Sequence, residues 1–199
     1  MVEYELLTQM LSRDFLSPDQ HNMEEPKQEG NHTCTIVETG VESYMSYRYD
    51  LDKSDFLPFF NKEHNDEERG IVVDNPTPKG LLKFCDYILL VSVGEKLYII
   101  LVEMKAGTNA GARLQLAASE TFIEYVKASA ERIKTLCGYD DFDTQNIILR
   151  KVLLKPAPKS RPTTNIGKRR NTQINWGANP IELWQQVFPL RKVCECRQR

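Results

Sequence analysis

The chain has 199 residues, of which 41% are hydrophobic, and it carries a formal net charge of -2. This length and apolar content fit one domain with a sizeable core and some appendages. No apolar run approaches the roughly 18 residues of a membrane span, and no basic, then apolar, leader opens the chain. We therefore expect neither a membrane segment nor a secretory signal.

The five cysteines, at positions 34, 85, 137, 194 and 196, form no pair of CxxC motifs. A zinc site is therefore not predicted, and a reduced, cytoplasmic setting is expected. His21, His32 and His64 lack metal-ligand spacing and are interpreted as surface residues.

Charge is divided unevenly along the chain. Residues 1–80 hold 17 acids and 7 bases, residues 81–154 hold 9 of each, and residues 155–199 hold 2 acids and 10 bases. Such a basic end can contact the phosphates of a nucleic acid, or it can be a solvated tail that pairs with the acidic half. Both interpretations stay open.

The first elements are predicted from apolar spacing. Leu6, Leu7, Met10, Leu11 and Phe15 recur at helical intervals and predict an amphipathic helix within residues 2–16. Residues 17–32 are polar and predict a loop. From Cys34 to residue 51 the pattern is extended, with Gly40 as a turn or bulge. Residues 52–69 are predicted to be a short apolar segment, LPFF, that leads into an acidic loop, and turn residues follow at 74–80.

The stretch from Lys83 to Gly107, KFCDYILLVSVGEKLYIILVEMKAG, predicts a β-hairpin with a turn at Gly94-Glu95. Placing Val93 opposite Lys96 sets a register in which Asp86 lies across from Glu103. Two carboxylates so close, with Cβ atoms about 4.5 to 5.5 Å apart, repel unless a cation compensates them. Lys105 shares their face because strand side chains alternate. This convergence of charges at one end of an apolar hairpin predicts a site.

A long helix, from Asn109 to Cys137, is predicted after the hairpin, ending at Gly138. A fourth strand is predicted over residues 146–154. A third, short helix is predicted over 181–188, after Pro180, to dock on the core or on a second subunit. The inward side of the long helix is predicted to carry the apolar stripe Leu114, Ala118, Phe122, Tyr125, Ser129, Ile133 and Leu136.

The residues Asp86 and Glu103-Met104-Lys105, each at the end of an apolar strand, resemble the motif of the PD-(D/E)xK nuclease superfamily. The resemblance covers about residues 81–154, and Cys85 stands where the family often has Pro. It implies an α/β fold with a restriction-endonuclease-like core, a central mixed β-sheet flanked by helices. We expect one domain over residues 1–199, with its core at about 34–154 and a basic C-terminal extension over 155–199.

The resemblance also implies roles for these residues. Asp86, Glu103 and the carbonyl of Met104 would bind Mg²⁺ or Mn²⁺, which prefers oxygen ligands and few carboxylates. Lys105 would orient or deprotonate the attacking water, and as a base it would need a pKa lowered by the nearby cation and by partial burial. Family members often have a Gln on the following helix, so Gln115 would position a water or phosphate. Arg113 is interpreted as an ordinary surface residue.

Some features lie outside that motif. A third carboxylate ligand, Glu38 or Glu42, is expected, and spacing does not choose between them. The run Lys168, Arg169 and Arg170, near Trp176, can grip a nucleic-acid backbone, although such runs are common in solvated loops. An alternative for the charged trio is an ion pair between Lys105 and Glu103, with Asp86 capping a turn.

The predicted function is metal-dependent hydrolysis of phosphodiester bonds, with DNA as the expected nucleic acid. The alternative is an inactive protein of the same fold that binds a protein or nucleic-acid partner. The sequence does not distinguish DNA from RNA, endonuclease from exonuclease, or a monomer from a homodimer or larger complex.

Overall fold

The computed structural model describes residues 1–25, 32–49, 84–105, 111–155, 181–184 and 187–195. Its helices are α1 (Val2–Met10), α2 (Ala112–Ile133) and α3 (Leu190–Glu195), with 3-10 turns at Arg13–Phe15, Thr135–Cys137 and Thr144–Asn146. Its strands are β1 (Asn22–Glu25), β2 (His32–Val37), β3 (Ser43–Arg48), β4 (Tyr87–Val93), β5 (Lys96–Met104), β6 (Ile147–Lys155), β7 (Ile181–Trp184) and β8 (Val187–Pro189).

The central sheet has five strands in the order β3-β4-β5-β6-β7. The first three strands run antiparallel, whereas β6 runs parallel to both β5 and β7. The chain therefore forms a mixed α/β fold, as expected. The β4–β5 hairpin has the predicted register, with Val93 paired to Lys96, and Gly94 takes the positive φ of 57° that the turn requires.

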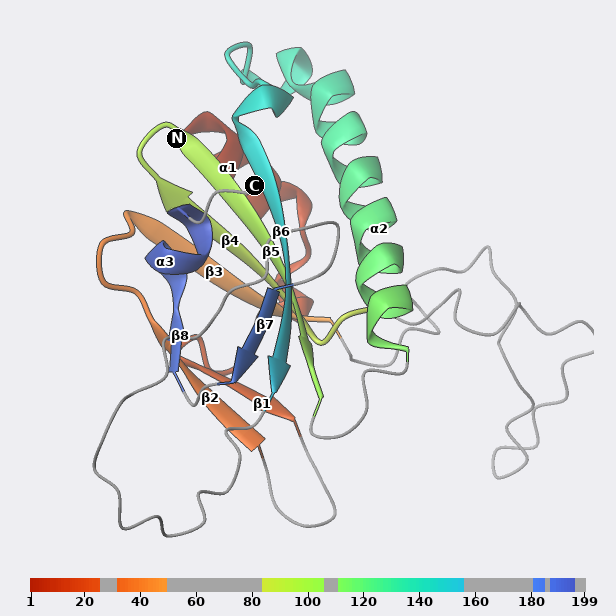
Figure 1. Ribbon diagram of the computed structural model, residues 1–199. Coiled ribbons are helices and arrows are strands. Elements are labelled where there is room, and N and C mark those ends of the chain that lie inside the picture. Colours follow the sequence, from red (N-terminus) through yellow and green to blue (C-terminus); the bar gives the residue numbers. More distant parts are fainter. Residues whose placement is uncertain (26–31, 50–83, 106–110, 156–180, 185–186, 196–199) are drawn as a thin grey trace, which may run out of the picture.

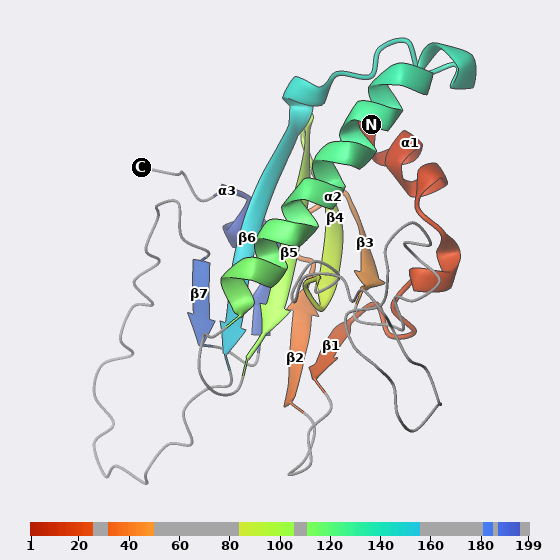
Figure 2. The same ribbon diagram turned by 90° about the vertical axis from the view of Figure 1, so that its right-hand side faces the viewer.

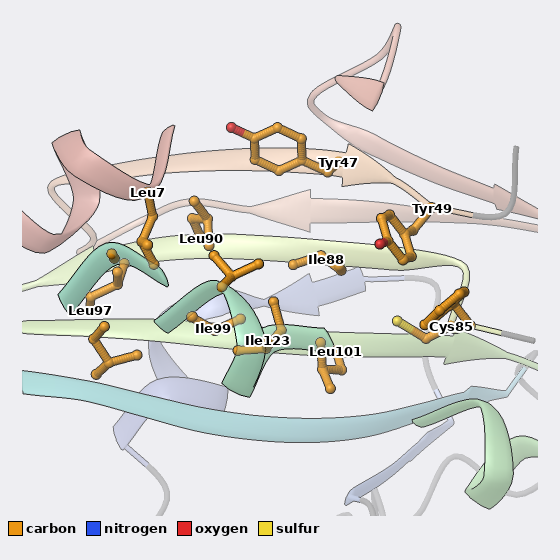
Figure 3. Packing of buried hydrophobic residues seen from close by; sticks show 14 of the residues in the cluster. Leu7, Tyr47, Tyr49, Cys85, Ile88, Leu90, Leu97, Ile99, Leu101 and Ile123 are labelled. Atoms are coloured by element: carbon orange, nitrogen blue, oxygen red, sulfur yellow. The ribbon is translucent and has the colours of Figure 1, made fainter. Parts of the chain in front are cut away.

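Two apolar layers cover the central sheet. On one face, even-numbered residues of β4 and odd-numbered residues of β5 pack against α1 and α2. In this layer, Tyr49 and Cys85 lie at one end, and Leu7 and Leu97 lie at the other (Figure 3). On the other face, the alternate residues of the two strands pack against α3 and a second sheet, β1-β2-β8 (Figure 1). Because both faces are covered, β4 and β5 are almost continuously apolar.

The helix predicted over residues 181–188 is wrong, because Ile181–Trp184 forms β7 and Val187–Pro189 forms β8. Its branched and aromatic residues suit strands, and β6 offers a sheet edge along which β7 pairs. The fold therefore reaches beyond the predicted core of 34–154, and the proposed docking helix does not exist. The N-terminal helix is shorter than predicted: it ends at Met10, and a 3-10 turn follows at Arg13–Phe15.

Helix α2 ends at Ile133, earlier than the predicted Cys137, and a 3-10 turn at Thr135–Cys137 then closes at the predicted Gly138, which has a φ of 76°. Its inward stripe was wrongly assigned. The buried residues are Ala112, Leu116, Ser119, Ile123, Val126 and Ala130. Leu114, Tyr125 and Leu136 are exposed. The helix carries two neighbouring stripes at the same period, and the buried one contains small residues that allow close approach to the sheet. No helix among these described ranges is long and apolar enough to cross a membrane.

Candidate active site

The predicted site lies at the edge of the central sheet where β5 and β6 end and α2 begins (Figures 1 and 2). Continued by one pair beyond Tyr87 and Val102, the hairpin register places Asp86 across from Glu103. Backbone hydrogen bonds also link this end of the hairpin to the chain after β3 on one side and to β6 on the other. Tyr49 N donates to Asp86 O at 2.8 Å, and Lys105 N donates to Leu154 O at 2.9 Å. The backbones of Asp86 and Lys105 are therefore each hydrogen-bonded to the neighbouring segment of chain on the outer side of the hairpin.

Glu103 and Lys105 form a close ion pair. The Nζ atom of Lys105 lies 2.6 Å from Oε1 of Glu103. The Glu103 side chain has no exposed surface, whereas that of Lys105 is 26% exposed. The pair thus joins a fully buried carboxylate to an ammonium that reaches the protein surface, as the shared face of the two residues predicted.

The Asp86 carboxylate has a clear structural partner. Its Oδ2 accepts a hydrogen bond from Met104 N at 2.6 Å. Strand β4 separates from β5 at this point, since Cys85 N donates instead to Ser119 Oγ of α2, at 2.8 Å. Asp86 therefore satisfies an amide that its neighbouring strand no longer pairs. Together with the ion pair, this bond matches the alternative in which the trio serves the fold.

Met104 and Gln115 both lie beside Asp86, Met104 through its backbone and Gln115 through a contact with the neighbouring Phe84. The side chain of Met104 is buried in the opposite apolar layer, so only its backbone reaches this edge. Gln115, in the first turns of α2, donates from Nε2 to the carbonyl of Phe84 at 3.2 Å. It thereby fixes the segment that leads into Asp86. Arg113 is exposed, as expected.

The expected third carboxylate is not Glu38 or Glu42. Glu42 accepts hydrogen bonds from Ser92 Oγ at 3.3 Å and from Gly94 N at 3.0 Å, so it caps the hairpin turn. That turn is a full strand away from Asp86, about 20 Å at 3.3 Å per residue. Glu38 pairs with His21 at 3.8 Å, four residues before Glu42. Both residues therefore belong to the other end of the hairpin.

Lys155 was missed in the sequence, where it was assigned to the basic extension. It is the last residue of β6, and only 7% of its surface is exposed. Glu103 pairs with Leu153 and Met104 with Leu154, so Lys155 lies next to Lys105 on the same face. Strand alternation gives the signal: residues 151, 153 and 155 share one face of the sheet.

Aromatic side chains lie next to Asp86 on the α2 side. The centroid of the Tyr49 ring lies 5.2 Å from the centroid of the Phe84 ring and 5.1 Å from that of the Phe122 ring. Burial, with a smaller contribution from Cys85, raises the pKa of Tyr49, so its hydroxyl stays neutral. Tyr49 and Phe122 border an apolar cavity of about 410 Å³ between α1 and α2, and Asp86, Glu103 and Lys105 are not among its lining residues.

The donor set at this edge fits a magnesium ion. It consists of two carboxylates, one from each of two neighbouring strands, and proteins usually bind Mg²⁺ with one or two carboxylates. In the described segments, no group of three or more His, Cys, Asp or Glu side chains is placed to hold a metal. A metal here would therefore depend on Asp86, Glu103, a backbone oxygen and water. Lys168, Arg169, Arg170 and Trp176 lie outside the described residues.

Comparisons of this chain with protein-family models, with curated proteins and with solved structures find no match.

Proposed function

We propose that the protein is a metal-dependent nuclease of the PD-(D/E)xK type, with a restriction-endonuclease-like fold and DNA as its substrate. One observation carries the proposal: the β4–β5 register, continued by one pair, places Asp86 opposite the fully buried Glu103, whose Oε1 lies 2.6 Å from Lys105 Nζ. Carboxylates placed in this way are costly to a fold that makes no use of them.

The order of elements supports the proposal. Strands β4 and β5, helix α2 and the parallel strand β6 follow one another, and the charged residues lie where β5 ends and α2 begins. This is the order that the resemblance implies. No two of the described cysteines, Cys34, Cys85, Cys137 and Cys194, form a disulfide. A reducing, cytoplasmic setting is therefore part of the proposal.

Each residue has a role in this chemistry. Asp86, Glu103 and the Met104 carbonyl would hold Mg²⁺ or Mn²⁺, which supplies charge neutralisation and a more acidic water when bound. Lys105 Nζ would orient the attacking water; as the base it would act as a neutral amine, take the proton of that water and become the ammonium that offsets charge on the phosphate. Gln115 holds the Phe84 carbonyl and so keeps the Asp86 segment in place.

The second candidate function is an inactive member of the same fold that acts by binding a partner. Two contacts favour it, the Lys105–Glu103 ion pair and the Asp86–Met104 hydrogen bond, because together they satisfy the trio without a metal. A purely structural trio and a metal site differ in one measurable respect. Only the metal site binds a divalent cation through Glu103.

Calorimetry with Mg²⁺ and Mn²⁺ tests the proposal, together with cleavage of supercoiled plasmid, single-stranded DNA and RNA. The variants are Asp86→Asn, Glu103→Gln and Lys105→Met. Glu42→Gln is the matched control, since it alters a carboxylate at the far end of the same hairpin. We expect the first two to lose metal binding and all three to lose cleavage, while the control retains both.

The opposite result would refute the nuclease proposal. In that case the wild type binds neither metal ion and cleaves none of the three substrates, while the variants at 86, 103 and 105 change only the melting temperature. The trio would then serve the fold, and the partner-binding function would become the better conclusion.

A further inference from the structure

Lys155 lies at the proposed site although nothing in the family motif assigns it a role. The β5–β6 register ends with Met104 paired to Leu154, and the Lys105 N to Leu154 O hydrogen bond continues the parallel ladder. The next pair along the strands is Lys105 with Lys155. Their side chains share the face of Glu103, because paired residues of neighbouring strands point to the same side.

The ammonium groups of Lys105 and Lys155 repel each other, as the carboxylates of Asp86 and Glu103 do. Like charges on directly opposite residues repel, and a lysine is almost never buried unless it meets an anion. Lys155 is nonetheless 93% buried, since only 7% of its surface is exposed. Glu103 lies diagonally across from Lys155, because it pairs with Leu153, which is two residues before Lys155 on β6. Two acids and two lysines thus meet on neighbouring strands at one edge.

This arrangement leaves little net charge at the site. A metal of charge two brings an excess of positive charge that the anionic phosphate of a substrate would balance. A lysine that is preorganised by burial holds such an oxygen with little loss of side-chain entropy. Lys155 is also on the opposite side of Lys105 from Asp86, since β5 lies between β4 and β6.

We propose that Lys155 is a substrate-binding residue that contacts a non-bridging oxygen of the phosphate that is cleaved. The inference rests on the proposed nuclease function and deepens it. In this arrangement the β4–β5 side of the site supplies carboxylates for the metal. The β5–β6 side supplies two ammonium groups for the phosphate.

The test is binding of a fluorescent DNA duplex without divalent metal, measured by anisotropy over a range of KCl concentrations. Each phosphate contact contributes about 0.9 to the slope of log K against log salt. We expect Lys155→Met to reduce the slope by about 0.9 and to weaken binding about tenfold, as for a lost charged hydrogen bond. Lys155→Arg should keep the wild-type slope.

Lys151→Met is the matched control. Lys151 is on the same strand and face, four residues or about 13 Å before Lys155. Its Nζ lies 3.0 Å from Glu120 of α2. This control should keep the slope of the wild type and its kcat/KM for plasmid cleavage, whereas Lys155→Met should lose most of that kcat/KM.

A folding defect can be separated from a binding defect. In a Glu103→Gln background the buried anion is already neutral, so the further change Lys155→Met removes a cation without leaving Glu103 charged. We expect the slope of this double variant to be lower than that of Glu103→Gln by about 0.9. An equal slope would overturn the role of Lys155.

The outcomes also separate the two proposals. A wild type that cleaves DNA, with slope and kcat/KM unchanged in Lys155→Met, overturns the role of Lys155 and leaves the nuclease proposal standing. A wild type that neither binds nor cleaves nucleic acid overturns the nuclease proposal, and the role of Lys155 with it.

Discussion

The Lys105–Glu103 ion pair predicts an unequal response to losing either partner. Lys105→Met removes the ammonium that lies 2.6 Å from a carboxylate with no exposed surface. Breaking a buried pair in this way costs about 3 kcal/mol, at the low end of the usual range because Lys105 is partly exposed. Glu103→Gln instead leaves a lysine that reaches water, and should cost about 1 kcal/mol. In a chain of this size these losses lower Tm by about 9 °C and about 3 °C.

Urea unfolding with and without Mg²⁺ measures both effects. If the carboxylates bind metal, Mg²⁺ at about 100 times its Kd restores about 2.7 kcal/mol to Lys105→Met, because the ion replaces the missing cation. Glu103→Gln should not respond. Equal losses in the two variants would refute the inference from burial. An unequal loss with no effect of Mg²⁺ would refute the metal site and leave the ion pair as a structural feature.

Three further changes test the surrounding fold. Glu42→Ala should cost about 1 kcal/mol in urea unfolding, because it removes the acceptor for Gly94 N and Ser92 Oγ, and it should leave metal affinity unchanged. A metal-affinity loss would place Glu42 in the site after all. Gly94→Ala should cost about 1 to 2 kcal/mol, from the positive φ alone, since a Cβ there meets no atom within 4 Å. An unchanged melting temperature would contradict the hairpin turn. Burial raises the pKa of Cys34 to about 12, so the folded protein keeps this proton at a pH where the unfolded chain has lost it. Stability should therefore fall as pH rises from about 9 towards 12. Alkylation at mildly alkaline pH, in a Cys196→Ser background that removes one other thiol, measures the burial of Cys34. It should modify the exposed Cys137 rapidly and the buried Cys34 only on unfolding. Rapid labelling of Cys34 in the folded protein would contradict its burial.

The hairpin and its charged edge were predictable because they are local. Gly94 fixes the turn, the turn fixes the register, and the register places Asp86 across from Glu103. The strand β6 was also predicted, from apolar residues on both sides of Arg150 and Lys151. What its sequence does not give is its partner, since parallel pairing with β5 depends on how α2 crosses the sheet. Lys155 was missed for this reason.

Other errors have equally physical causes. The sequence pattern over 181–188 is compatible with a helix or a strand. Ile181–Trp184 forms a strand because it can pair with the otherwise open side of β6. On α2, two apolar stripes compete, and close packing favours the one with Ala112, Ser119 and Ala130. Glu42 and Glu38 were candidates because spacing says only that they precede the hairpin. Tertiary pairing of β3 with β4 places Glu42 beside the turn.

The position of Glu103 allows a final distinction between folding and function. On the same face of β5, Leu97, Ile99 and Leu101 are buried apolar residues, and Glu103 continues their line with no exposed surface. An apolar residue there would extend the core without the cost of desolvating a charge. Well-packed apolar replacements of buried ion pairs are often neutral or stabilising, by about 1 to 4 kcal/mol.

We therefore expect the double variant Glu103→Leu with Lys105→Met to be at least as stable as the wild type, while binding no Mg²⁺ and cleaving no DNA. Thermal unfolding and calorimetry on the same sample measure both properties, and Lys105→Met alone provides the destabilised comparison. Such a result means that the fold has no need of these charges, and that their place in the core reflects chemistry at the site. A double variant as unstable as Lys105→Met would show instead that the trio holds the sheet edge together.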